Sequence, residues 1–311
     1  MRTKNIFVML LLAGMMTASA EYAYPYSIPS SSGKSGLAFL KVGVGGRNLA
    51  MGDTGVASSN DATAVFYNPA LLPLTLSRGL FFSYHNFILD VNQQYVGGNF
   101  KWLGQNYFGF GLNLFTVPNI EKRDSPSKDP DFLFDSRDFS LGFSWGKHIT
   151  AKLALGIGAK LVYEKVDIDD LTGYAADFGA VYDILPTVRA GAAVKNVGPK
   201  VKFISEKFDL PREFRLGLAY HPQMEFLSGQ WIATGDLVKS IDADLRGQIG
   251  MEYSYEDVIM PRLGYSFNYS DKDITAGFGL KYRDYAFDYA FVPYSSNLGN
   301  SHHLTLGLIF R

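Results

Sequence analysis

The chain contains no cysteine among its 311 residues, which excludes disulfide bonds and thiolate metal sites. The formal net charge is only −1, so no basic field is present to attract nucleic acid or an anionic membrane surface. Long apolar runs are also absent, because the longest one, residues 6–16, is too short to span a bilayer as a helix. These absences argue against a disulfide-stabilised scaffold, a nucleic-acid-binding protein and a bundle of transmembrane helices.

Catalytic and metal-binding motifs are missing as well. The segment 43–46 (GVGG) resembles a dinucleotide loop, but Asn48 replaces the third glycine and no βαβ unit surrounds it. His302 and His303 are adjacent in a predicted strand, so their side chains would point to opposite faces and could not share one ion. The acidic segment 167–170 does not have the spacing of an EF-hand loop. We therefore expect a protein that is not an enzyme and that has no cofactor or metal site.

The first 20 residues have the organisation of an export signal. Arg2 and Lys4 precede the apolar run, and Ala18-Ser19-Ala20 matches the small-residue pattern of a cleavage site. We predict cleavage after residue 20, so that the mature chain begins at Glu21 outside the cytoplasm.

Apolar and polar residues alternate along most of the remaining chain. Aromatic residues make up 15% of the sequence, yet mean hydropathy is close to zero, which is typical of a barrel with a lipid-facing and a lumen-facing side. In residues 152–165, Leu155 and Ile157 would face one way and Gly156 and Gly158 the other. A period of two sustained over this length predicts lipid outside and lumen inside.

Counting such segments predicts an all-β fold, an antiparallel transmembrane barrel of about fourteen strands. The predicted strands lie near residues 78–87, 94–103, 106–116, 136–147, 151–166, 174–184, 187–197, 211–221, 230–239, 245–256, 259–270, 273–283, 285–292 and 302–311. Most even-numbered connections are short and most odd-numbered ones, including the fifth, are longer, which predicts an N-terminus on the periplasmic side.

Residues 39–74 are the exception to this alternation, because they are rich in glycine and other small residues. Asn60 or Asp61 would cap a short helix over residues 62–66, and Pro69 would end it. We predict a hatch or plug segment over residues 21–76, with short helices, in front of a barrel over residues 77–311.

The hatch segment also resembles a known family. The stretches FLKVGVGGRNLAMGDTGVA (39–57), DA (61–62) and YNPALLPL (67–74) are similar to the N-terminal signature of the PorV/PorQ group of outer-membrane proteins, which are themselves similar to the FadL fatty-acid transporters. The shared Asn-Pro-Ala falls on Asn68, Pro69 and Ala70. The resemblance implies a hatch that fills the lumen of a 14-stranded barrel in the outer membrane of a Gram-negative-type bacterium.

Five hatch residues are candidates for a structural or gating role: Arg47, Asp53, Asn68, Pro69 and Ala70. A guanidinium inside a barrel needs a carboxylate partner, and the carboxylates considered are Asp53, Asp61, Asp177, Glu213 and Glu252. Arg47 would then be either a structural tether, which we favour, or a latch that releases the plug. Asn68 and Pro69 would fix the turn by which the plug leaves the lumen.

Two functions are compatible with the sequence. The resemblance to PorV implies a component of a type IX-like secretion system that binds exported cargo proteins, for which the outer segments 117–134, 197–210 and 293–300 would be the docking surface. The resemblance to FadL implies a passive conduit for hydrophobic small molecules, for which Gly109 and Gly111 would allow a lateral gap. The expected partners are outer-membrane lipid and either cargo or other secretion components, or a hydrophobic ligand, but no nucleic acid.

Overall fold

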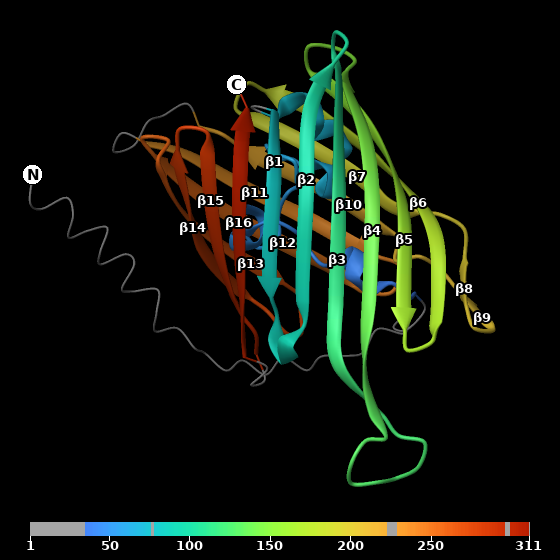
Figure 1. The fold of residues 1–311 in the computed structure, drawn as a ribbon. Helices are drawn as coiled ribbons and strands as arrows, with labels where there is room; N and C mark the ends of the chain where they lie inside the picture. Colours follow the sequence, from blue (N-terminus) through green and yellow to red (C-terminus); the bar gives the residue numbers. More distant parts are fainter. Residues whose placement is uncertain (1–34, 76–77, 223–228, 296–298, 311) are drawn as a thin grey trace, which may run out of the picture.

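The strands of the chain close into one antiparallel barrel (Figure 1). The computed structural model describes residues 35–75, 78–222, 229–295 and 299–310. Within these residues, fourteen strands form the barrel, each pairs with its neighbours in the chain, and β1 pairs with β16 to close it. The barrel strands are β1 (Arg78–Asn86), β2 (Asn92–Trp102), β3 (Asn106–Lys122), β4 (Phe132–His148), β5 (Leu153–Val166), β6 (Asp169–Leu185), β7 (Val188–Val197), β10 (Glu213–Tyr220), β11 (Gly229–Ser240), β12 (Leu245–Tyr255), β13 (Ile259–Phe267), β14 (Ile274–Tyr282), β15 (Tyr285–Pro293) and β16 (Asn300–Phe310). The predicted fold class is therefore confirmed.

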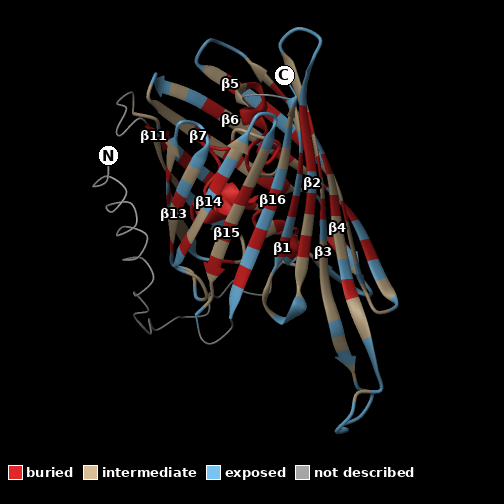
Figure 2. Ribbon diagram, turned by 60° about the vertical axis from the view of Figure 1, so that its left-hand side comes forward, coloured by how far each residue is buried: buried red, intermediate tan, exposed pale blue. Residues whose placement is uncertain are grey.

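Side chains alternate between the two faces of the wall, as the sequence predicts. In β10 every second residue from Glu213 is buried, and every second residue from Phe214 is exposed. Figure 2 shows the same change between buried and exposed residues along other strands. In β5, Leu155 and Ile157 face outward while Gly156 and Gly158 are buried inside. The exposed row is apolar because it faces lipid, and the buried row is polar or small because it faces the lumen.

The two ends of the barrel differ in their connections. The turns after β2, β4, β6, β12 and β14 lie at the same end as the C-terminus and are short, and we name this the turn end. At the opposite loop end, β3 and β4 continue as a hairpin beyond the other strands (Figure 1). The connection from β5 to β6 is only residues 167–168, because β6 begins at Asp169 and not near residue 174. The prediction of a longer fifth connection is therefore wrong.

The connection between β7 and β10 holds a small hairpin that the sequence did not indicate. Its strands are β8 (Val201–Phe203) and β9 (Glu206–Phe208), which pair only with each other. Val201 and Leu210 of this connection are buried against Leu37 and Phe39 of the N-terminal segment. The predicted docking segment 197–210 is therefore partly buried, and half of 117–134 is strand and not loop.

Residues 35–75 lie inside the barrel, and we call them the plug (Figure 1). The plug contains η1 (Ala38–Lys41), α2 (Gly46–Ala50), α3 (Ala64–Tyr67) and η2 (Pro69–Leu74); another short helix, η3 (Ile88–Asp90), links β1 to β2. It begins at the loop end, where Ser35 bridges Asp209, and it leads to β1 at the turn end. The N-terminus, which the sequence predicts on the periplasmic side, lies outside the described residues. None of the helices in the described ranges is long and apolar enough to cross a membrane. The predicted signal peptide lies outside the described residues, as does the predicted boundary between hatch and barrel at residues 76–77.

Candidate functional site

Arg47 of α2 is tied to the barrel wall by a buried ion pair. Its Nε and Nη2 donate to the two carboxylate oxygens of Glu252 in β12, at 2.9 and 3.0 Å. Its Nη1 donates to the carbonyl oxygen of Ser58 within the plug at 2.9 Å. Both charged side chains are only 6% exposed. Of the five carboxylates considered from the sequence, Glu252 is the one that bonds to Arg47, through the two-point geometry that arginine and carboxylate favour.

The same carboxylate also belongs to a chain of charges along the wall. Arg262 of β13 donates from Nε to Glu252 and from Nη1 to Asp288 of β15, both at 2.5 Å. The order of charges is therefore Arg47, Glu252, Arg262 and Asp288, with each sign next to its opposite. Burial lowers the pKa of Arg47, but the field of Glu252 more than offsets this, so its pKa is raised and the guanidinium stays charged.

Asp53 links two parts of the plug to each other. Its backbone has φ of 70°, just after α2, and its carboxylate accepts a hydrogen bond from the hydroxyl of Tyr67 at 2.6 Å. Burial and the Asp53 carboxylate raise the pKa of Tyr67 well above its usual range, so the hydroxyl keeps its proton and donates it. Asp53 and Tyr67 thereby connect α2 to α3, so the two helices are held as one body.

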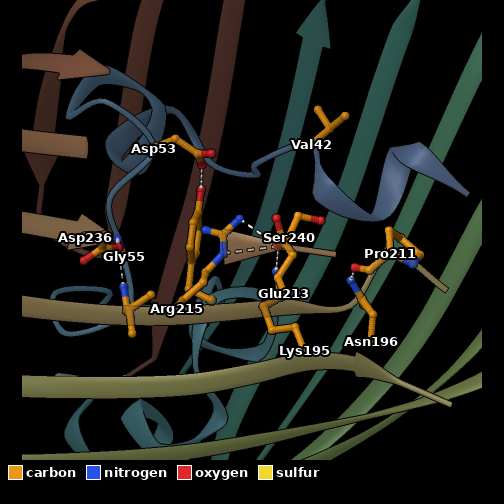
Figure 3. A network of polar contacts seen from close by, with 12 residues as sticks. Val42, Asp53, Gly55, Lys195, Asn196, Pro211, Glu213, Arg215, Asp236 and Ser240 are labelled. Carbon is orange, nitrogen blue, oxygen red and sulfur yellow. Dashed lines mark hydrogen bonds and ion pairs between the residues drawn. The ribbon is translucent and has the colours of Figure 1, made fainter. Parts of the chain in front are cut away.

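Two cations from neighbouring strands lie against the aromatic rings of α3. Nζ of Lys195 in β7 is 3.5 Å from the ring centre of Phe66, and the guanidinium of Arg215 in β10 lies 5.8 Å from the ring centre of Tyr67. Glu213 accepts hydrogen bonds from Arg215 at 3.0 and 3.2 Å, and its nearest oxygen is 3.9 Å from Nζ of Lys195 (Figure 3). This side of the plug is held by cation–π contacts in addition to charge pairing.

The side chain of Asp236 in β11 binds backbone N–H groups of the plug. One carboxylate oxygen accepts hydrogen bonds from the N–H groups of Gly55 and Val56, at 2.8 and 3.0 Å (Figure 3). The sequence did not identify Asp236 as a site residue, although it departs from the apolar alternation of this strand. That departure was the available signal, since an inward carboxylate in a membrane strand requires donors.

Asn68 is the residue of the Asn-Pro-Ala motif with the most hydrogen bonds. Its side-chain oxygen accepts from the N–H of Ala70 at 3.0 Å, which caps η2. Its Nδ2 donates to the carbonyl of Val56 at 2.8 Å and lies 3.3 and 3.4 Å from the carbonyls of Ala180 and Ala192 in the wall. Asn68 therefore joins two parts of the plug to β6 and β7.

Pro69 and Ala70 approach the backbone of the barrel so closely that the wall must carry glycine there. A Cβ at Gly156 would lie 2.3 Å from the carbonyl carbon of Pro69, and one at Gly179 would lie 1.9 Å from the side-chain oxygen of Asn68. Pro69 ends α3, as predicted, and occupies the first turn of η2, where its missing N–H costs nothing. The motif thus fixes where the plug meets β5 and β6.

Gly109 and Gly111 do not form the lateral gap expected of them. The pairing of β3 with β2 and β4 continues through both residues, and its irregularity lies further along, between Val117 and Ile120. A Cβ at Gly109 would lie 2.5 Å from Val65 of the plug, and one at Gly111 would lie 2.4 Å from the Tyr95 hydroxyl. These glycines make room for side chains inside the lumen.

A polar cluster ties the plug to the wall at the loop end. Asp242, between β11 and β12, accepts a hydrogen bond from Nζ of Lys41 at 2.6 Å and further bonds from the hydroxyls of Ser35 and Ser240. Burial alone would raise the pKa of Asp242, but these donors more than offset it and lower the pKa to about 2. Asp242 therefore stays ionised and holds the start of the plug.

The other motifs weighed in the sequence lie apart from the plug contacts. His302 is exposed and its Nδ1 bonds to the hydroxyl of Tyr289, whereas His303 is buried in the lumen beside Ser301, so the two imidazoles do face opposite sides. In the acidic segment 167–170, Asp167 pairs with Lys122 at 2.6 Å. Among the described residues, no three His, Asp or Glu side chains converge in a way that could hold a metal ion.

Comparison with protein families gives one match. The family described as "Type IX secretion system protein PorV" matches residues 32–228, which is more than half of the chain and includes the whole plug. No curated protein matches the chain at a significant level.

Solved structures with a similar fold include two toluene transporters and a FadL homologue. The toluene transporter TbuX of Ralstonia pickettii superposes with a TM-score of 0.63 at 16% identity, over 86% of this chain and 99% of that one. The toluene transporter TodX of Pseudomonas putida gives 0.63 at 15% identity, over 86% and 99%. A FadL homologue of Pseudomonas aeruginosa gives 0.55 at 11% identity, over 86% and 97%. At these identities the similarity is one of fold.

Proposed function

The chain belongs to the family of the type IX secretion system protein PorV, an outer-membrane barrel family, and on this basis we propose that it binds exported cargo proteins at its outer surface as part of a type IX-like secretion system. In this role the barrel is a membrane-anchored receptor and not a pore, and it catalyses no reaction. The observation that carries the proposal is the way the plug is fixed in the lumen.

Three sets of buried contacts hold the plug to the part of the wall that runs from β6 to β12: Arg47 with Glu252, Asp236 with the N–H groups of residues 55 and 56, and Asn68 with β6 and β7. The cavity between α3 and strands β3 to β5 measures about 20 Å³, which is room for one water molecule. Movement of solute through this lumen would require these contacts to break. A fixed plug therefore favours a role for the outer surface.

The loop end offers a surface suited to a protein partner. The hairpin of β3 and β4 extends past the pairing of β4 with β5, which begins at Ser136, so residues 132–134 of β4 are paired on the β3 side alone. Phe132 and Leu133 are half exposed there, beside the charged tip at residues 123–131. Exposed aromatic and apolar residues next to a polar rim are typical of protein interfaces.

The second candidate is passive transport of a hydrophobic molecule, as in the toluene transporters of similar fold. The observation that favours it is the apolar cluster at the loop end, where Leu37, Phe39 and Leu40 of the plug pack with Val201 and Leu210. An apolar ligand could replace these contacts and so bind at the outer mouth of the barrel.

The test replaces residues 123–131, the tip of the β3–β4 hairpin, with an Asn-Gly turn. Cargo release should fall at least about tenfold if the tip contributes a typical central interface contact, while the amount of folded, heat-modifiable barrel is unchanged. The matched control replaces residues 149–152, the turn between β4 and β5 at the turn end, and should secrete normally. Unchanged secretion by the shortened hairpin would contradict the receptor role.

The two candidates differ in a second measurement. A transporter should copurify with an apolar molecule at the outer mouth, and Leu40→Asp should stop its uptake. If uptake fails in Leu40→Asp while secretion continues, the transport function replaces the cargo function.

A further inference from the structure

A hollow lies on the outside of the barrel wall, next to the seam where β1 and β16 close the sheet. It has a volume of about 410 Å³ and is lined by residues 78–80, 98–100, Phe110 and Phe310. All of these lie near the turn end of β1, β2, β3 and β16. The short turns place this end on the periplasmic side, so the hollow opens into the periplasmic leaflet of the membrane.

Gly98, at an outward position of β2, is one of the residues that line the hollow. Residues alternate along β2, so Gly98 faces lipid while its neighbour Asn99 faces the lumen and bonds to Thr75 of the plug. A Cβ at Gly98 would lie 2.5 Å from the Phe110 ring and 3.1 Å from Leu80. The Phe110 ring and Leu80 therefore lie over Gly98, which is buried although it is on the lipid side of the strand.

The walls are apolar and open to the membrane. Leu80, Phe100 and Phe310 remain 44%, 41% and 50% exposed, so their faces are free for contact with a neighbouring molecule. The volume falls within the range of about 300 to 1,000 Å³ that small-molecule sites occupy. This shape and lining suit part of an acyl chain.

One cation lies at the rim of the hollow. Arg78, the first residue of β1, is exposed and outward-facing, and none of the ion pairs among the described residues involves it. Guanidinium groups bind phosphate through two parallel hydrogen bonds. We propose that this hollow is a phospholipid site, with the lipid phosphate on Arg78 and one acyl chain along Leu80, Phe100 and Phe310.

A bound phospholipid would cover this part of the wall, at the start of β1. Both requirements of the ligand, a phosphate at the membrane surface and an apolar chain below it, are met together by a lipid of the periplasmic leaflet. A protein partner is the competing occupant, and the test below separates the two. The proposal rests on the outer-membrane location and not on the cargo role.

The test measures phospholipid retained by the full-length barrel after extensive washing in detergent, using native mass spectrometry. The wild-type protein should retain one phospholipid per chain. Arg78→Gln should lower retention about fivefold, the effect of one cation at a lipid surface. Gly98→Val should abolish retention, because the new side chain would push the Phe110 ring and Leu80 into the hollow. Heat-modifiability on gels checks that each barrel is folded.

Two matched controls keep the result specific. Lys101→Gln removes another exposed cation from the turn end, and Gly235→Val adds a side chain at a lipid-facing glycine of β11, where a Cβ would have ordinary contacts. Both should retain lipid as the wild type does. Retention that is equal in all five proteins would overturn the proposal. Loss of a copurifying protein in folded Gly98→Val, with lipid unchanged, would assign the hollow to that partner instead.

Discussion

Replacing Glu252 should destabilise the plug more than replacing Arg47, and the two losses of stability can be measured. Glu252→Gln removes the only carboxylate that bonds to Arg47 among the described residues and leaves that buried guanidinium with the carbonyl of Ser58. Arg47→Met instead leaves Glu252 paired with Arg262. The two substitutions break the same contact, but only the first one leaves a buried charge without an opposite charge bonded to it.

The magnitudes follow from that asymmetry. Breaking a buried pair from one side costs about 3 to 5 kcal/mol when the remaining charge is unpaired, which is the expectation for Glu252→Gln. Arg47→Met should cost about 1.5 to 3 kcal/mol, the worth of hydrogen bonds to a charged group. The double variant should cost less than the sum of the two, with a coupling of about 1 to 3 kcal/mol.

Urea unfolding in phospholipid vesicles gives the free energies, and single-channel conductance in planar bilayers reports the position of the plug. Glu252→Gln should raise conductance while the barrel stays heat-modifiable. Arg137→Met is the matched control, because its pair with Asp135 is 72% and 37% exposed and should contribute at most about 1 kcal/mol.

The outcome that would refute this reasoning is additivity. If the double variant costs the sum of the single variants, and if conductance is unchanged in all three, the ion pair does not hold the plug in the lumen.

Three further predictions concern other parts of the molecule. Ile157→Arg on the lipid face should cost about 2 to 4 kcal/mol of insertion free energy at the bilayer midplane, measured by folding into vesicles, whereas Ser144→Ala on the lumen face should be mild. The pKa of Asp242 in the folded protein is about 2, below its ordinary 3.8, so its carboxylate stabilises the start of the plug above about pH 4 and this stabilisation is lost as the pH falls toward 2. At low pH a protease should then reach Lys41. Asp242→Asn should remove this pH dependence. Asn68→Ala should destabilise the plug by about 1 to 3 kcal/mol, seen as higher conductance with an intact barrel.

The sequence alone determined the barrel fold and which side chains of the strands face lipid or the lumen. The alternation in segments such as 152–165 predicts for each residue whether it faces lipid or the lumen. Each strand and its two faces can therefore be predicted from the segment alone, and counting such segments gives about fourteen strands. The same holds for the end of α3 at Pro69, because the restriction that proline places on the preceding residue is a local effect.

Contacts between distant segments were decided by the tertiary structure. Arg47 and Glu252 are 205 residues apart, and five carboxylates had equal claims until closure of the barrel brought one of them to the guanidinium. The hairpin of β8 and β9 was not predicted because three-residue strands gain little on their own, and it is the packing of Val201 and Leu210 on Leu37 and Phe39 that stabilises it.

The glycines of the wall show the same limit most clearly. In the sequence, Gly109 and Gly111 were interpreted as places for a kink and Gly156 as a small lumen-facing residue. In the structure, the plug or a lumen side chain approaches each of them too closely for a Cβ. Alternation predicts which side of the wall a residue faces. The side chains that fill the space on that side come from other parts of the chain, and only the folded barrel brings them together with the glycines.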